Sequence, residues 1–88
     1  MNYELLFTKD AKKDLKKIKQ YPALFENLKD LLRIIEQNPF KNSPSFEKLQ
    51  GDFKGAYSRR INIKHRLVYQ VYQTEMKIKV ISVWTHYE

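Results

Sequence analysis

The chain has 88 residues, and we expect a single domain over residues 1–88. It contains no cysteine, which excludes a disulfide scaffold, a cysteine nucleophile and a thiolate zinc site, and with only two histidines we expect no metal or cofactor. A formal net charge of +7 favours a polyanionic partner: nucleic acid, an acidic protein or an anionic membrane surface. No apolar run could span a bilayer and the start has no signal-peptide pattern, so we expect a cytoplasmic protein with no membrane partner.

The first half of the chain predicts one strand followed by two helices. Residues 3–7 are rich in apolar side chains and favour a strand. Residues 9–20 favour a helix, because apolar residues recur at helical spacing after Thr8, a suitable N-cap. A second amphipathic helix begins at Pro22 and ends near Asn38, since the proline that follows cannot continue it.

The second half predicts strands after a long connection. Residues 39–55 contain prolines, serines and glycines and favour an irregular loop, and long ordered loops in small domains are often functional. Residues 56–63, 66–73 and 77–84 favour three strands joined by short links, hence an antiparallel meander. The expected fold class is α+β: one N-terminal strand, two helices on one face of the sheet, and a three-stranded antiparallel meander in that sheet.

The basic stretch between Lys48 and Arg66 has aromatic residues among its cations. RNA can be cleaved without a metal by its own 2′-hydroxyl, if the protein supplies a base, an acid for the 5′-oxygen, and cations for the phosphate. Composition alone matches this chemistry weakly, because many small basic domains contain such groups by chance. The polar candidates are Glu47, Arg59, Arg60, His65, Arg66, His86 and Tyr87.

Two local patterns refine this set. Arg59 and Arg60 are adjacent, so in a strand their side chains point to opposite faces. We expect Arg60 to line a site, and Arg59 to make a surface ion pair or to contact RNA. For His65, in a tight turn, we expect a structural hydrogen bond, and for Trp84 a place in the core or at a dimer contact.

One stretch of the sequence forms a motif specific enough to suggest a family. Residues 58–69 read S-R-R-I-N-I-K-H-R-L-V-Y, with E-K-L at 47–49 and H-Y at 86–87. This pattern resembles the YoeB (Txe) branch of the RelE superfamily of bacterial toxin–antitoxin toxins, over essentially the whole chain although loosely in the helices. The resemblance implies a RelE-like, microbial-ribonuclease-like fold and a ribosome-dependent endoribonuclease (an mRNA interferase) that cuts mRNA in the A site and inhibits translation. The implied partners are an acidic YefM/Axe-like antitoxin, the ribosome with its mRNA, and a second copy in a homodimer.

The resemblance also implies roles by position. Glu47 would be the general base and His86 the general acid, while Arg66 would stabilise the scissile phosphate. Two alternatives stay open: a non-catalytic RNA- or ribosome-binding module, for which Glu47 and His86 are dispensable, and a degenerate toxin kept as an antitoxin-binding corepressor.

The remaining family positions would contact RNA. Arg60 would assist at the phosphate, Arg59 is a further candidate for RNA, and Tyr87 would stack on or position a base of the codon. The family often has lysine where this chain has Gln50, and Lys48 would take over that contact.

Overall fold

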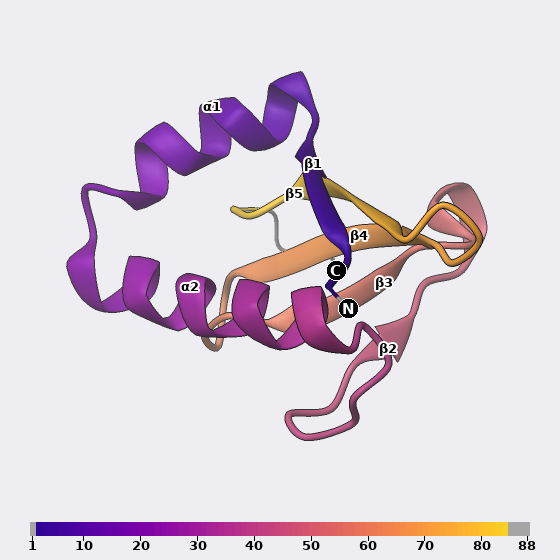
Figure 1. Cartoon of the computed structure of the whole chain (residues 1–88). Coiled ribbons are helices and arrows are strands. Elements are labelled where there is room, and N and C mark those ends of the chain that lie inside the picture. Colours follow the sequence, from indigo (N-terminus) through magenta and orange to yellow (C-terminus); the bar gives the residue numbers. More distant parts are fainter. Residues whose placement is uncertain (1, 85–88) are drawn as a thin grey trace.

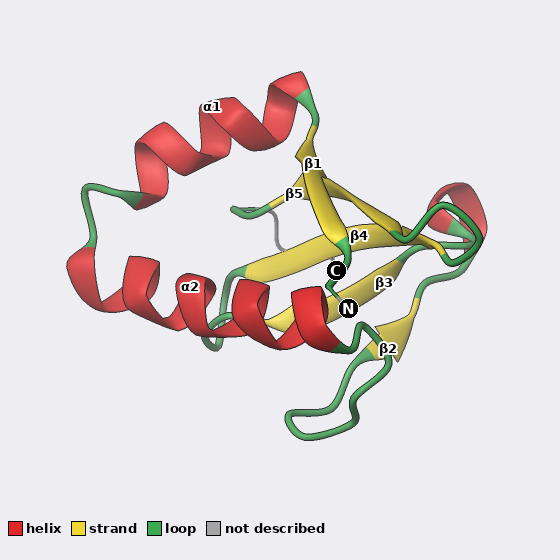
Figure 2. Cartoon of the chain, viewed as in Figure 1, coloured by secondary structure: helices red, strands yellow, loops and turns green. Residues whose placement is uncertain are grey.

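The structure, a computed structural model that describes residues 2–84, has two helices packed against one face of a five-stranded sheet (Figures 1 and 2). In chain order the elements are β1 (Glu4–Phe7), α1 (Lys9–Ile18), α2 (Pro22–Gln37), β2 (Glu47–Lys48), the 3₁₀ helix η1 (Gly51–Phe53), β3 (Tyr57–Arg60), β4 (Arg66–Tyr72) and β5 (Lys77–Ser82). The strand order is β1-β5-β4-β3-β2, with β1 parallel to β5 and the other neighbours antiparallel. The α+β class, the two helices and the meander β3-β4-β5 are as predicted.

Both helices begin where the sequence predicts. The Thr8 side chain accepts a hydrogen bond from the backbone N of Ala11 at 3.1 Å, which satisfies a donor that the first turn leaves free. α1 ends at Ile18, two residues before the predicted end, because Gln20 N and Tyr21 N donate to Lys17 O and Ile18 O, three residues back, and so close a turn in place of the helical ladder. α2 ends at Gln37, one residue before the predicted end.

The strands differ from the prediction in number and length. The sheet has five strands, because β2 forms within the segment predicted to be irregular; Figure 1 shows it beyond the long loop that leaves α2. Two residues with no alternation are too short a pattern to predict a strand, and β2 exists through its antiparallel pairing with β3. β3 ends three residues before the predicted boundary because the chain turns there, with Ile61 N and Asn62 N both donating to His65 O.

The face of the sheet under the helices, called the covered face below, contains the core. Successive strand residues point to opposite faces, so Leu67 and Tyr69 of β4 lie with Ile78 and Val80 of β5 under the helices. The buried residues of this cluster are Ala11, Ile18, Leu28, Leu31, Ile35, Ile61, Leu67, Tyr69, Ile78, Val80 and Val83. The other side, the open face, therefore receives the alternate residues of β3 and β4, including Ser58, Arg60 and Arg66 of the motif.

β1, near the start of the described residues, pairs in parallel with β5, near their end. Its parallel register places Glu4 opposite Lys77 and Phe7 opposite Val80. Immediately before β1, Tyr3 N donates to Glu36 O of α2 at 2.8 Å. No helix in residues 2–84 is long and apolar enough to cross a membrane.

Candidate functional site

A cavity of about 340 Å³ lies on the open face. The register explains its composition: Glu47 of β2 is opposite Ser58 of β3, and Arg60 of β3 is opposite Arg66 of β4. Residues two apart in one strand share a face, so these four side chains lie on the same side of the sheet. The cavity, called the Glu47 pocket below, is lined by Pro44, Ser45, Glu47, Ser58, Arg60 and Arg66.

An ion pair joins two of the candidate catalytic residues. Arg66 Nη1 lies 3.3 Å from Glu47 Oε1 and also donates to Ser58 Oγ at 3.3 Å. The Glu47 side chain is 63% exposed and that of Arg66 20% exposed, so water still reaches the pair. Exposed pairs of this length contribute little stability, and an incoming anion can take the place of the carboxylate on Arg66.

The charges of the pocket suit a phosphodiester. Arg60 and Arg66 carry two positive charges against the single carboxylate of Glu47, so the pocket has a net positive charge. Arginine donates in a fixed fork that fits phosphate oxygens, and an unbound carboxylate can accept a proton from a substrate hydroxyl. Ser58 was not assigned a role from the sequence, although it precedes the two arginines of the motif. Lys48 is exposed on β2 and lies outside the lining of the pocket.

The prediction that Arg59 makes a surface ion pair or contacts RNA is wrong. Arg59 is 0% exposed, and its guanidinium donates hydrogen bonds to groups of the protein. Its face of β3 is shared with Tyr57 and Ile61, which both pack in the core. This apolar i±2 pattern was the available signal that Arg59 points inward and Arg60 outward, as the structure has them.

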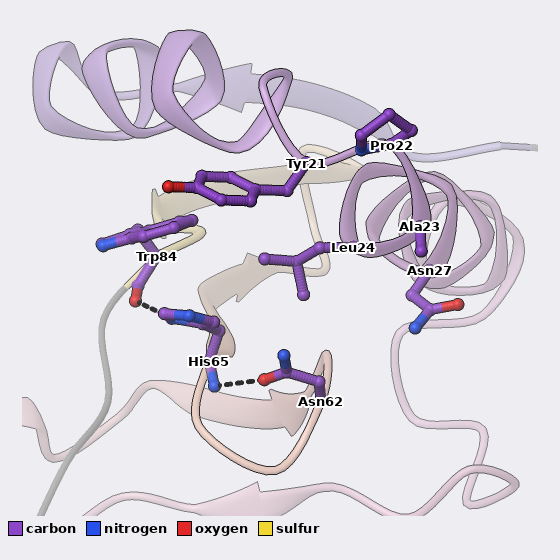
Figure 3. Close-up of a pocket in the computed structure, with 8 residues that line it drawn as sticks. All are labelled: Tyr21, Pro22, Ala23, Leu24, Asn27, Asn62, His65 and Trp84. Carbon is purple, nitrogen blue, oxygen red and sulfur yellow. Dashed lines mark hydrogen bonds between the residues drawn. The ribbon is translucent and has the colours of Figure 1, made fainter.

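A second, larger cavity of about 610 Å³ lies between the turn that joins α1 to α2 and the turn that joins β3 to β4 (Figure 3). His65 Nδ1 lies 2.8 Å from the backbone O of Trp84, and the two rings stack at 4.1 Å. The structural hydrogen bond predicted for His65 is therefore confirmed. Trp84 is half-buried and packs against the core. This cavity, the Trp84 groove, is lined by Tyr21, Pro22, Ala23, Leu24, Asn27, Asn62, His65 and Trp84.

His86 and Tyr87 lie outside the described residues, so their predicted roles stay predictions. Of the groups predicted for metal-independent cleavage, the Glu47 pocket contains the carboxylate and the two arginines. The proton donor for the leaving oxygen would come from His86. Within residues 2–84, no three Asp, Glu or His side chains are close enough together to hold a metal ion.

Solved structures of bacterial toxins share this fold. The YoeB/ParE toxin from Agrobacterium tumefaciens is 32% identical with a TM-score of 0.86, and the match covers 96% of this chain and 99% of that chain. YoeB from Staphylococcus aureus is 34% identical; its dimer and its complex with YefM match with TM-scores of 0.84 and 0.81, over 99% of this chain and 100% of each matched chain.

Comparison of the amino-acid sequence with known families identifies the same kind of protein, a bacterial toxin. Residues 7–87 match the family model described as the YoeB-like toxin of the bacterial type II toxin-antitoxin system, so the chain is a toxin of that class. Toxin YoeB from Synechocystis sp. is 37% identical over 84 residues, which cover 96% of this chain and 84% of that toxin. The chain belongs to the family of YoeB-like toxins.

Proposed function

We propose that this toxin is a ribosome-dependent endoribonuclease, which cuts mRNA in the A site and thereby inhibits translation. The observation that carries the proposal is the Glu47 pocket: a carboxylate paired with Arg66 at 3.3 Å, with Arg60 beside them, on a face that the helices leave open. The expected resemblance to YoeB toxins, now shown for residues 7–87, supports this choice of reaction.

The proposed reaction needs no metal. Glu47 accepts the proton of the 2′-hydroxyl, whose oxygen attacks the adjacent phosphorus and forms a 2′,3′-cyclic phosphate. The bond from phosphorus to the 5′-oxygen breaks, and His86 donates a proton to that oxygen, which leaves as a hydroxyl. Arg66 and Arg60 hold the phosphate oxygens while negative charge develops on them.

The RNA would be held mainly by contacts that do not depend on its sequence. Tyr87 stacks on or positions a codon base, and Lys48, exposed next to Glu47, contacts a phosphate. Within residues 2–84 the pocket offers one carboxylate and two arginines to an RNA, so we expect alignment of the 2′-hydroxyl with the phosphate to need help. The ribosome supplies that alignment by holding the codon, which makes cleavage of free RNA slow.

The proposed partners follow from charge and from relatives. The Staphylococcus aureus relative has been solved in complex with YefM and as a dimer. We therefore expect this chain to bind an acidic YefM/Axe-like antitoxin and to form a homodimer in the cytoplasm. The net charge of +7 favours both an acidic peptide and ribosomal RNA.

The test is to map mRNA 5′ ends in a cell-free translation reaction. The wild-type toxin should produce cuts inside ribosome-bound codons, and Glu47→Gln and His86→Gln should each remove them. Glu26→Gln is the matched control, because Glu26 is exposed on α2, away from the Glu47 pocket, and pairs with Lys29 of the same helix. Inhibition of translation without cuts would instead identify a non-catalytic RNA- or ribosome-binding module and end the proposal.

A further inference from the structure

Arg59 makes an unusual set of contacts for a buried cation. Its side chain is 0% exposed, and all three guanidinium nitrogens donate hydrogen bonds. Nε donates to the Tyr69 hydroxyl at 2.9 Å and Nη1 to Pro44 O at 2.6 Å. Nη2 donates to two carbonyls, Pro39 O at 3.0 Å and Lys41 O at 2.6 Å. Three of the four acceptors therefore belong to the loop of residues 39–46.

None of these four acceptors carries a charge. A buried cation is costly unless its donors are satisfied, and here neutral oxygens satisfy them. The Phe46 ring adds a cation–π contact, with its centroid 5.1 Å from Arg59 Cζ. The Tyr69 hydroxyl in turn donates to Pro39 O at 3.0 Å. Burial raises the pKa of Tyr69, which keeps its hydroxyl protonated and able to donate.

The loop that Arg59 binds forms part of the Glu47 pocket. Pro44 and Ser45 line the pocket, and Glu47 follows one residue after Phe46. The loop has no helix or strand, and its first turn is closed by Lys41 N donating to Asn38 O. Arg59 connects the loop to β3 through the carbonyls of residues 39 and 41 in that turn and of residue 44 beyond it, and Phe40 and Phe46 of the loop pack against Tyr57 of β3. A loop held in this way presents the next residue in a fixed position.

We propose that Arg59 is a positioning residue: by binding three carbonyls of loop 39–46 it holds Glu47 opposite Arg66. This inference rests on the proposed nuclease function, because it concerns the base of that reaction. Arg59 itself touches no substrate. Its planar fork is required, since the ammonium of lysine is a point charge that cannot span acceptors spread along the loop.

The decisive variant is Arg59→Lys, which keeps the charge and removes the fork. We expect amide hydrogen exchange of residues 39–48 to become faster by about tenfold or more, while exchange in the helices stays unchanged. We expect kcat for ribosome-bound mRNA to fall by about tenfold or more with KM changed less than about twofold, because misplacing one reacting group reduces the rate without removing the phosphate contacts. Arg33→Lys is the matched control, because Arg33 is exposed on α2 and pairs with Asp30; both measurements should stay unchanged.

The exchange measurement uses the free toxin, so it separates the two proposals. A wild-type toxin that never cuts mRNA would end the nuclease proposal. A folded Arg59→Lys with unchanged loop exchange, or with a mobile loop and an unchanged kcat, would overturn the positioning role. If Arg59→Lys does not fold, Tyr69→Phe takes its place. It removes one acceptor of Arg59 and the bond to Pro39 O, and it should produce the same changes at smaller size.

Discussion

Arg59 and Arg60 are neighbours in β3, yet they belong to two different regions of the molecule. Arg59 lies on the covered face, without exposure, and its donors are used by the protein. Arg60 lies on the open face, is exposed, and lines the Glu47 pocket. The same side chain is thus structural where water is excluded and available to an anion where it is not.

The two faces of the sheet differ from each other as Arg59 differs from Arg60: one is shielded from water by the helices, and water reaches the charged groups of the other. The covered face contains a continuous apolar core, and its polar groups Arg59 and Tyr69 bind each other and the loop. The open face contains an ion pair that solvent reaches. Substitutions of Glu47 and Arg60, which are exposed on the open face, should therefore change activity with little loss of stability, and substitutions on the covered face should do the reverse or change both.

The largest effect should come from Glu47→Gln. Removing the proposed base should lower the single-turnover rate of mRNA cleavage on the ribosome by about 10²–10⁴-fold. The melting temperature should stay the same, because the side chain is 63% exposed and its pairing with Arg66 is weak. Rate and thermal unfolding are measured on the same preparation. A wild-type rate in the variant would contradict the role of Glu47 as base.

Arg66→Lys should have the next largest effect on activity. The lysine keeps the charge but loses the fork that Arg66 offers to phosphate, so the cleavage rate should fall by about 10²-fold. Quench-flow measurement at saturating toxin separates this loss from weaker binding. If the loss appears only in KM, Arg66 serves to bind RNA and does not stabilise the transition state.

Tyr69→Phe probes the covered face. It removes an acceptor of the buried Arg59, and the free energy of unfolding should fall by about 1–3 kcal/mol. Burial raises the pKa of Tyr69 above its usual value of 10.0, so the folded protein keeps a proton that the unfolded chain releases. The contribution of Tyr69 to stability is therefore complete below pH 10.0 and declines as the pH rises toward the folded-state pKa.

Urea unfolding between about pH 8 and about pH 11 measures how the contribution of Tyr69 to the free energy of unfolding changes with pH. The wild type should lose more stability across the alkaline range than Tyr69→Phe does. Parallel curves for the two proteins would show that Tyr69 does not titrate differently in the folded and unfolded states.

The smallest effect is expected for Arg60→Gln. Binding to ribosomes should weaken by only a few-fold, and the slope of log affinity against log salt should decrease by about 1, because one phosphate contact is lost. Stability should not change, in contrast to substitutions of Arg59. A clear drop in melting temperature would show that the contrast between the two arginines is smaller than the structure indicates.

The sequence predicted most of the fold because its signals are local. Thr8 and Pro22 mark the starts of the helices, and their apolar residues recur at helical spacing. The parallel pairing of β1 with β5 was not predicted, since it joins residues more than 70 positions apart in the chain. β2 was missed because two residues carry no periodicity and its formation depends on β3.

The candidate site was predicted through a family motif, and the structure shows where that motif is insufficient. It groups Arg59 with Arg60, although only Arg60 lines the pocket. Tyr57 and Ile61, two residues to either side of Arg59, indicate the buried face, and alternation could have assigned it. The hydrogen bonds of Arg59 to loop carbonyls could not be predicted, because they depend on the path of a segment without regular structure.

The pairing of β1 with β5 has a consequence for how the protein is made. β1 is synthesised more than 70 residues before β5, its strand neighbour in the described sheet. Closing so long a loop is slow compared with forming the helices, and β1 has no sheet partner until residues 77–82 have been synthesised. A nascent chain interrupted before that point lacks its completed sheet. If this toxin halts ribosomes as proposed, a ribosome that stalls on the toxin's own message before residue 82 holds a nascent chain in which β1 lacks its full strand partner.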